Sequence, residues 1–336
     1  STIASGTPDD ITYTFSADQL QLQIDELIGK EGKSVTPDAF MVAMTDAAGT
    51  SRLAQTGDAT AIDQTTTVGE LSYDIDFSVP DGENPGHLKA KGGYSGLTST
   101  ANGNIPADFD PMKMDEALSA GYAMNADLSF ATGQTALDFT DPEQSMAFNS
   151  SSQGGSFAVG MSNAGMVYNV DTRDIVLSLE GSEIPFPINT TLGAFGFGIT
   201  MPVAPGDEVQ DFSARLALTD AAVPEPLWMM IDAGNALPHD PLTAEIELSG
   251  KAKLFVNIMD QAALTNAAKS QTTPGELSQL TLGKLLLKAA GATITANGAF
   301  DVDNTARSPI NPDLPAFDGQ IDLRMTGVTT LLGQLG

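Results

Sequence analysis

The stretch "GATITANGAFDVD", residues 291–303, alternates apolar and polar side chains with a period of two. Its apolar set is Ala292, Ile294, Ala296, Phe300 and Val302. The intervening positions are mostly polar: Thr293, Thr295, Asn297, Ala299, Asp301 and Asp303. This alternation is typical of a β-strand with one apolar and one solvent-facing side. The stretch therefore predicts a strand, and the question is what covers its apolar side.

The same alternation recurs along most of the chain. Clear examples are "ITYTF" (11–15), "LSYDIDFSV" (71–79), "GAFGFGITMPV" (193–203), "DFSARLALTD" (211–220) and "FDGQIDLRMTG" (317–327). Six short segments between residues 125 and 182 follow one another with the spacing of an antiparallel meander. We also interpret "LSQLTLGKLLLKAAG" (277–291) as a strand, which pairs with the opening stretch through a turn at Ala290 and Gly291.

Helical spacing is confined to a few segments. We expect helices at 16–32, where Ser16 and Gln19 form a capping box and Gly29 and Gly32 can close the helix, and at 109–124, with Asp110 as the cap and Pro111 at the first position. Residues 36–49 are expected to form a second, short helix, with a strand as the alternative. Further helical patterns lie at 225–237 and 328–336, and the small-residue linker 261–276 has room for one or two helical turns.

Together these patterns predict a mainly β fold, in which strand residues outnumber helical residues by about two to one. We expect a large curved antiparallel sheet system, either an open groove or sandwich-like, with a few short peripheral helices. Strong α/β alternation is absent, so the sequence does not support a parallel nucleotide-binding sheet. We expect residues 1–336 to form a single elongated β-rich domain, with 101–111 as the best candidate for an internal boundary.

The charge balance excludes several classes of partner. The net charge is −28, from 43 acidic and 15 basic side chains. Such a field repels phosphate backbones and anionic membrane surfaces, so we expect no nucleic-acid binding. The acidity suits solubility, or alternatively the binding of cations or a basic partner. No stretch of 18 apolar residues occurs, so no transmembrane segment is predicted.

Residues suited to catalysis are scarce. The chain has no cysteine and only two histidines, His87 and His239, each beside a turn. We find no nucleophile elbow, phosphate loop, dinucleotide fingerprint or histidine-based metal motif. A carboxylate pair could serve a glycosidase, but the sequence singles out no pair among the 43 acidic residues. We therefore predict a protein that is not an enzyme and has no catalytic residue, metal or cofactor.

One acidic segment, "DVDNTARSPINPD" (301–313), has two interpretations. Its oxygen donors Asp301, Asp303, Asn304 and Asp313 are of the kind that bind calcium. However, the segment lacks the glycine and glutamate of a helix–loop–helix calcium site, and a turn between strands favours the same residues for conformational reasons. We expect a turn, with calcium as the alternative.

Residues 212–253 carry the most distinctive motif of the chain. Its features are Leu227-Trp228, Ile231-Asp232, Gly234, Ala236-Leu237-Pro238, Asp240-Pro241 and Leu248-Ser249-Gly250. On these features the chain resembles an uncharacterised alphaproteobacterial family known as domain of unknown function 2125, best over residues 212–336. That resemblance implies a secreted or periplasmic envelope protein, and it implies no activity. The style of the strand hairpins is also similar to AsmA-like envelope proteins, whose long curved sheets hold lipid on an apolar concave face.

Two functions follow for the apolar side of the sheet. It can bind a lipid or another apolar ligand, in which case we expect Phe195, Phe197, Ile199, Ile294 and Phe300 to line the site. Alternatively, the apolar sides pack on one another, and the protein is a scaffold or protein-interaction module of the envelope with a closed core. We favour the non-catalytic ligand-binding interpretation, in the periplasm or secreted. The sequence identifies no protein partner.

Overall fold

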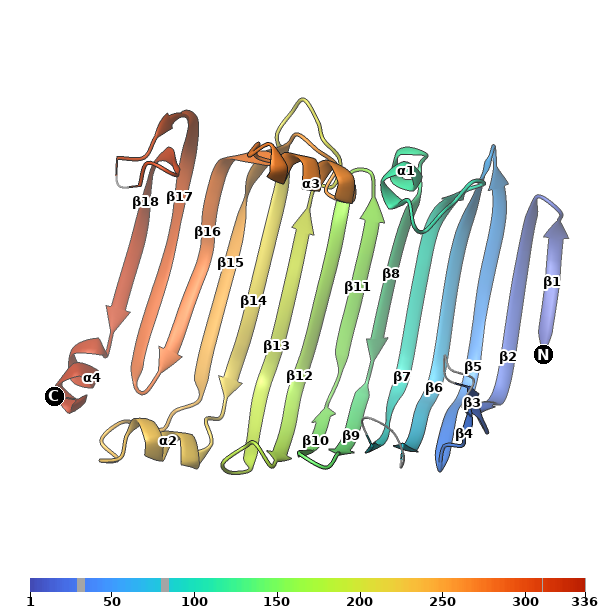
Figure 1. Cartoon of the computed structure of the whole chain (residues 1–336), viewed down its shortest axis with the longest axis horizontal. Coiled ribbons are helices and arrows are strands. Elements are labelled where there is room, and N and C mark those ends of the chain that lie inside the picture. Colours follow the sequence, from blue (N-terminus) through green and yellow to red (C-terminus); the bar gives the residue numbers. More distant parts are fainter. Residues whose placement is uncertain (29–33, 80–84, 310, 336) are drawn as a thin grey trace.

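The computed structural model describes residues 1–336 except 29–33, 80–84, 310 and 336 (Figure 1). Its strands form one antiparallel sheet of 16 strands, with a separate two-stranded ribbon. Strands hold 67% of the residues and helices 8%. The predicted mainly β fold, with a large antiparallel sheet and few short helices, is confirmed. The excess of strand over helix is larger than the expected two to one, because two segments predicted as helices are strands.

The strands follow one another across the sheet almost in chain order. The N-terminal part contains β1 (Thr2–Thr7), β2 (Asp10–Gln23), β5 (Ala39–Thr56), β6 (Ala59–Val79) and β7 (Gly86–Pro106). The middle contains β8 (Ala123–Phe130), β9 (Thr132–Thr140), β10 (Ser145–Ser152), β11 (Gly155–Ser162) and β12 (Gly165–Gly181). The C-terminal part contains β13 (Ile188–Met201), β14 (Gln210–Ala221), β15 (Leu242–Leu254), β16 (Gly275–Ala289), β17 (Ala292–Arg307) and β18 (Pro315–Thr326). The ribbon is β3 (Leu27–Ile28) with β4 (Ser34–Val35).

In the described part of the chain, four short helices lie at the ends of the strands. α1 (Met114–Ser119) and α3 (Gln261–Lys269) lie at one end of the sheet, and α2 (Glu225–Ile231) and α4 (Val328–Leu335) lie at the other (Figure 1). Among the described residues, no helix has the length and apolar character that a bilayer crossing requires. The boundary region expected at 101–111 covers the end of β7 and the turn toward α1, and the sheet continues on both sides of it.

The helix expected at 16–32 is wrong in its described part, which belongs mainly to strand β2. At 36–49 the favoured helix is also wrong, and the alternative interpretation as a strand is confirmed by β5. The apolar residues of the two segments pair across the two strands, Leu20 with Met44 and Leu22 with Val42. Ser16 does not cap a helix, since its hydroxyl lies 2.9 Å from the Ser1 hydroxyl. Long-range strand pairing has overridden a local pattern that also fits a helix. Gly29 and Gly32 lie outside the described residues.

The other helical expectations need smaller corrections. α1 begins at Met114 rather than at Pro111, and Asp110 instead closes a turn by accepting a hydrogen bond from the Met112 amide at 2.9 Å. The linker 261–276 contains a true helix, α3. The Asp260 side chain caps it by accepting from the Ala263 amide at 2.8 Å, which satisfies one of the free donors of the first turn.

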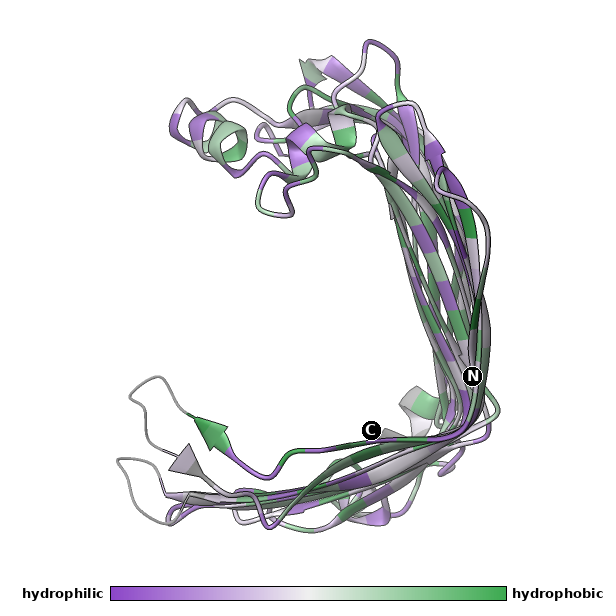
Figure 2. Cartoon of the chain, turned by 90° about the vertical axis from the view of Figure 1, so that its right-hand side faces the viewer, coloured by the Kyte–Doolittle hydropathy of each residue, from purple (hydrophilic) through white to green (hydrophobic). Residues whose placement is uncertain are grey.

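The sheet bends sharply along a line that crosses its strands, and this bend makes a C-shaped section (Figure 2). Cross-strand pairing is interrupted where the strands meet the line, for example between Thr45 and Ala48 in β5 and between Val68 and Glu70 in β6. We call this line the crease. Its members are Asp18, Asp46, Gly69, Gly96, Ala131, Gly154, Asp174, Gly193 and Asp220.

Backbone conformation explains the crease. Asp46, Asp174 and Asp220 have φ of 50°, 49° and 48°, and Gly96 and Gly154 have φ of 59° and 121°. Left-handed residues interrupt the regular pleat, and Asp and Gly tolerate that conformation best. The interruption also shifts the alternation by one residue: the inward positions of β6 are even up to residue 68 and odd from residue 71. Because such a shift exchanges the two sides of a strand, both limbs of the bend present their apolar side to the inside.

Candidate ligand-binding face

Register alone identifies one continuous face across the sheet. Directly paired residues of antiparallel strands point to the same side. Starting from Phe15 in β2, the partners run across thirteen strands to Leu323 in β18. The members of this central row are Phe15, Gly49, Thr66, Ser99, Leu128, Phe157, Val170, Phe197, Leu216, Ile246, Leu285, Ala296 and Leu323. With neighbouring strands about 4.8 Å apart, the row is on the order of 58 Å long.

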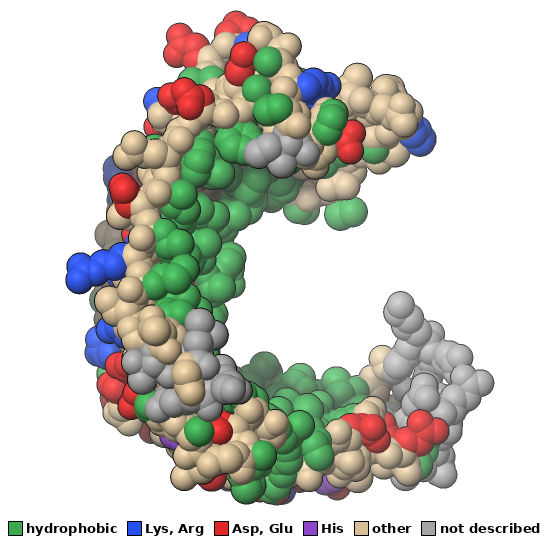
Figure 3. Space-filling model, turned by 90° about the vertical axis from the view of Figure 1, so that its left-hand side faces the viewer, with side chains coloured by type: hydrophobic (Ala, Val, Ile, Leu, Met, Phe, Trp, Pro, Cys, Tyr) green, Lys and Arg blue, Asp and Glu red, His purple; other side chains and the backbone are tan. Residues whose placement is uncertain are grey.

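This face is the concave side of the sheet, and outside the crease its described residues include no acidic side chain, lysine, arginine or histidine. Figure 3 shows hydrophobic side chains lining the hollow of the C, while acidic and basic side chains lie on the outside and on the rims. Outside the crease, and as far as Val302 in β17, the paired positions on this side hold no Asp, Glu, Lys, Arg or His. The chain has 58 charged residues (43 acidic plus 15 basic), so their exclusion defines a distinct surface.

The face is open to solvent rather than covered by a second layer. Large apolar side chains on it stay exposed: Leu216 by 47%, Leu287 by 38%, Phe197 and Tyr168 by 36%. Singly exposed apolar residues are ordinary on soluble proteins, but a contiguous apolar surface of this extent marks an interaction site. Of the two architectures expected from the sequence, the strands therefore form the open groove.

The structure places all five predicted lining residues on this face. Phe195, Phe197 and Ile199 project from β13, and Ile294 and Phe300 project from β17. The register connects the two groups: Phe195 pairs with Leu218, which pairs with Ala244, then Leu287, then Ile294. The groups therefore lie four strands apart on one wall of the groove.

The character of the groove changes along its length. In the N-terminal strands the inward side includes hydroxyl and amide side chains such as Ser51, Gln64 and Thr66. On the other side of the crease, the hydroxyl of Tyr73 in β6 lies 2.8 Å from the hydroxyl of Thr135 in β9, with β7 between the two strands. From β14 to β18 the inward side is almost entirely aliphatic and aromatic. The C-terminal half is therefore the more apolar part of the groove.

The convex side has the opposite character. A second row of direct partners begins Thr14, Thr50, Thr65 and Thr100 and reaches Arg215, Glu247 and Lys284. Ion pairs join neighbouring strands on this side, including Lys91 with Asp74 at 3.2 Å and Lys89 with Asp76 at 3.1 Å. Hydrogen bonds from the partners, mainly His87 and then Lys89, hold the pKa of the Asp76 carboxyl below its usual value.

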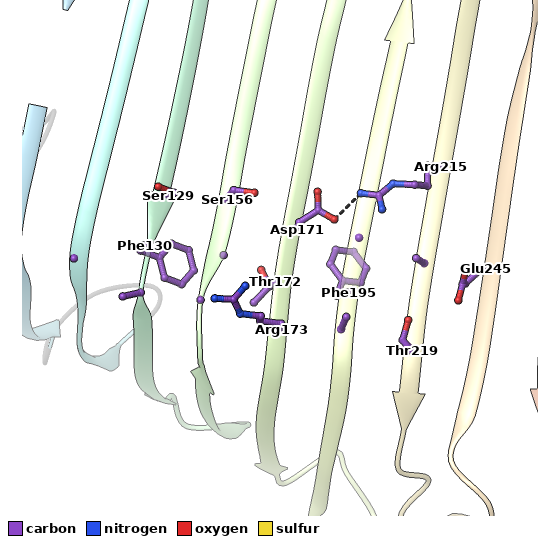
Figure 4. A pocket seen from close by; sticks show the side chains of 17 residues that line it. Ser129, Phe130, Ser156, Asp171, Thr172, Arg173, Phe195, Arg215, Thr219 and Glu245 are labelled. Atoms are coloured by element: carbon purple, nitrogen blue, oxygen red, sulfur yellow. Dashed lines mark hydrogen bonds and ion pairs between the residues drawn. The ribbon is translucent and has the colours of Figure 1, made fainter. Parts of the chain in front are cut away.

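A hollow of about 700 Å³ lies at the crease, where charged side chains such as Asp171 and Arg215 lie beside Gly and Ala residues and the rings of Phe130 and Phe195 (Figure 4). Its charged groups already have partners. Arg215 donates to Asp171 at 2.5 Å, and the Arg173 guanidinium donates to the Gln153 carbonyl at 2.9 Å. These contacts tie strands together where the crease interrupts their pairing, so we assign this hollow a structural role.

The acidic segment 301–313 is largely a strand end rather than a loop, since β17 continues to Arg307. Its donors have local partners: Asp303 accepts from the Thr305 amide at 2.9 Å and from the Thr305 hydroxyl at 2.6 Å, and Asn304 donates to the Leu277 carbonyl at 2.8 Å. The Thr305 hydrogen bonds lower the pKa of the Asp303 carboxyl. Among the described residues, no group of three His, Cys, Asp or Glu side chains is arranged to hold a metal.

The motif at 225–241 forms a compact helix and loop that connect β14 to β15. The Trp228 and His239 rings stack with centroids 4.4 Å apart, and Trp228 packs with Leu237 and Ala290. Buried Asp232 accepts from the Ala236 amide at 3.0 Å and the Leu237 amide at 2.7 Å, which holds the loop closed. The sequence motif is therefore explained by packing and loop closure.

We expect Asp232 to make the protein less stable in acid. The Ala236 and Leu237 amides, with a smaller contribution from nearby His239, lower the pKa of its carboxyl. A lowered pKa stabilises the fold above the unfolded value of about 3.9, and that stability is lost as the pH falls toward the folded value. Urea unfolding between pH 6 and pH 2.5 measures this effect. The free energy of unfolding of Asp232→Asn should fall less steeply with decreasing pH than that of the wild type. Asp240→Asn, exposed in the same loop, is the matched control and should leave the slope unchanged; an equal change in both variants would contradict this role.

The sequence interpretation missed most of the face. Leu216, Ile246 and Leu285 occupy the centre of the row but were not singled out, although each lies in a segment predicted to be a strand. Alternation indicated that they share a side with their own strand neighbours, but only the pairing register joins them across strands. No family model, curated protein or solved structure matches the chain.

Proposed function

We propose that this protein binds a lipid, or another long apolar molecule, along the concave face of its sheet and does not catalyse a reaction. The observation that carries the proposal is a continuous open face that spans the sheet and, in the described part of the chain and outside the crease, holds no Asp, Glu, Lys, Arg or His side chain. Contact with hydrocarbon is more favourable for such an apolar surface than contact with water. Burying a sixteen-carbon chain is worth on the order of 10 kcal/mol at about 0.8 kcal/mol per CH₂.

The dimensions favour more than one acyl chain. The hydrocarbon core of a bilayer is about 30 Å thick and holds two chains end to end, so one chain spans about 15 Å. A row on the order of 58 Å therefore has room for several chains laid along the groove. An uncharged groove leaves a headgroup at the rim or in solvent. The net charge of −28 makes neutral or zwitterionic headgroups the expected ones.

A periplasmic or secreted location belongs to the same proposal. Its support is the resemblance of residues 212–336 to an alphaproteobacterial envelope family and the general likeness to AsmA-like proteins. An open apolar groove on a chain of this negative charge also suits a carrier that moves lipid between surfaces without adhering to anionic membranes. The alternative, a scaffold, would leave this exposed face without a ligand.

The test is to extract the purified protein with organic solvent and identify the extracted lipids by mass spectrometry. We expect lipid at more than one chain per protein, absent from a mock purification of cells that lack the protein. Delipidated protein should then bind a fluorescent fatty-acyl probe. Protein that carries no lipid and binds no probe would favour the scaffold.

A further inference from the structure

The C-terminal edge of the sheet is an unpaired strand whose apolar side is still exposed. Strand β18 pairs with β17 on one side, and no described strand pairs with its other side. Its inward residues Phe317, Ile321, Leu323 and Met325 are 50%, 53%, 54% and 52% exposed. The apolar face therefore runs to the edge without stopping. Exposed edge strands of this kind are templates for a further strand.

The charges of β18 match a second copy of the same strand. In an antiparallel pair centred on Ile321, Asp318 lies opposite Arg324 of the other copy, and Arg324 lies opposite its Asp318. The same register places Phe317 opposite Met325, so apolar residues meet on the inward side. Opposite charges directly across strands attract, and like charges repel. The overlap covers residues 316–326 in each copy.

Neighbouring registers are disfavoured by the same charges. Centring the pair on Gln320 places Asp318 opposite Asp322, and centring it on Asp322 places that residue opposite itself. A shift by an odd number of residues would turn the apolar side of one copy outward. The other free edge, β1, offers only residues Thr2–Thr7, which carry no charged side chain to match β18.

We propose that two copies of this chain associate through their β18 strands in the register centred on Ile321. The two-fold axis then passes midway between the two Ile321 residues, perpendicular to the sheet, so both concave faces open to the same side. The two grooves join into one apolar channel of double length. This association is independent of the proposed function, because it depends on the strand edge and its charges and not on a ligand.

The first test uses charge exchange, measured by sedimentation equilibrium at about 0.15 M salt, where long-range repulsion between the acidic chains is screened. The wild type should dimerise. Asp318→Arg alone, or Arg324→Asp alone, should raise the dimer Kd about tenfold or more, because each places like charges opposite one another twice. The double exchange should restore the Kd to near the wild-type value. A wild type that stays monomeric up to high micromolar concentration overturns the proposal, as does a double exchange that does not rescue.

The second test uses the absence of cysteine from the chain. Ile321 meets its own copy at the axis, at a separation within the range for a disulfide. Ile321→Cys should therefore form a disulfide-linked dimer under mild oxidation. Leu323→Cys is the matched control, because it lies on the same side of the same strand with almost the same exposure, 54% against 53%. Its copies are separated by four residues along the strands and should not cross-link. Equal cross-linking of the two variants would overturn the register.

Discussion

Gly154→Val is expected to destabilise the protein by about 3 kcal/mol and to disturb the bend of the sheet. Gly154 has φ of 121°, and a Cβ built there would lie 2.9 Å from Nη2 of Arg173. The unfavourable backbone alone costs about 1–3 kcal/mol. The new side chain also displaces the Arg173 guanidinium, which donates to the Gln153 carbonyl at 2.9 Å. Urea unfolding, monitored by circular dichroism, measures the decrease in the free energy of unfolding.

Gly57→Val is the matched control for this variant. Gly57 also has a positive φ, 64°, but it lies in the turn between β5 and β6, and a Cβ there would meet nothing within 4 Å. Its substitution should cost only the backbone preference, about 1–2 kcal/mol. If the two variants lose the same stability, the crease contacts of Gly154 do not contribute. If Gly154→Val keeps wild-type stability, the crease does not need this conformation.

The crease illustrates what the sequence predicts and where prediction stops. In β6 the inward residues Ile62 and Val68 are even, while Leu71, Tyr73 and Ile75 are odd, and Gly69 lies between them. That change of phase is visible in the sequence and indicates a slip within one strand. It does not indicate that the neighbouring strands slip at matching positions. That alignment depends on pairing between distant segments, and it converts a set of local irregularities into one bend.

The candidate face follows the same rule. Alternation alone placed Phe195, Phe197 and Ile199 on one side of a strand, and Ile294 and Phe300 on one side of another. It left open whether the two sides meet, because register across β14, β15 and β16 is not encoded in any single strand. It also misread 16–32, where helical and strand periods both fit the apolar residues. Local pattern therefore predicts sides of strands, and only pairing joins them into a groove.

Leu216→Asp is expected to abolish most ligand binding while leaving the fold intact. Leu216 lies in the central row between Phe197 and Ile246 and is 47% exposed, so an aspartate there stays hydrated in the empty groove. The cost to folding should stay within about 1 kcal/mol. When hydrocarbon covers the site, the carboxylate loses water without gaining a partner, which costs at least about 2 kcal/mol. Affinity for a fluorescent fatty-acyl probe should fall about 30-fold or more.

Ser213→Asp separates the effect of location from the effect of charge. Ser213 lies on the same strand, pairs with Thr200 and Ser249, and is exposed on the convex side. It adds the same negative charge at a distance of three residues, so any general repulsion of the probe acts equally on both variants. We expect Ser213→Asp to bind the probe as the wild type does and to retain the co-purified lipid that Leu216→Asp loses. An equal fall in both variants would assign the effect to net charge, and no fall in either would place the ligand elsewhere than on the concave face.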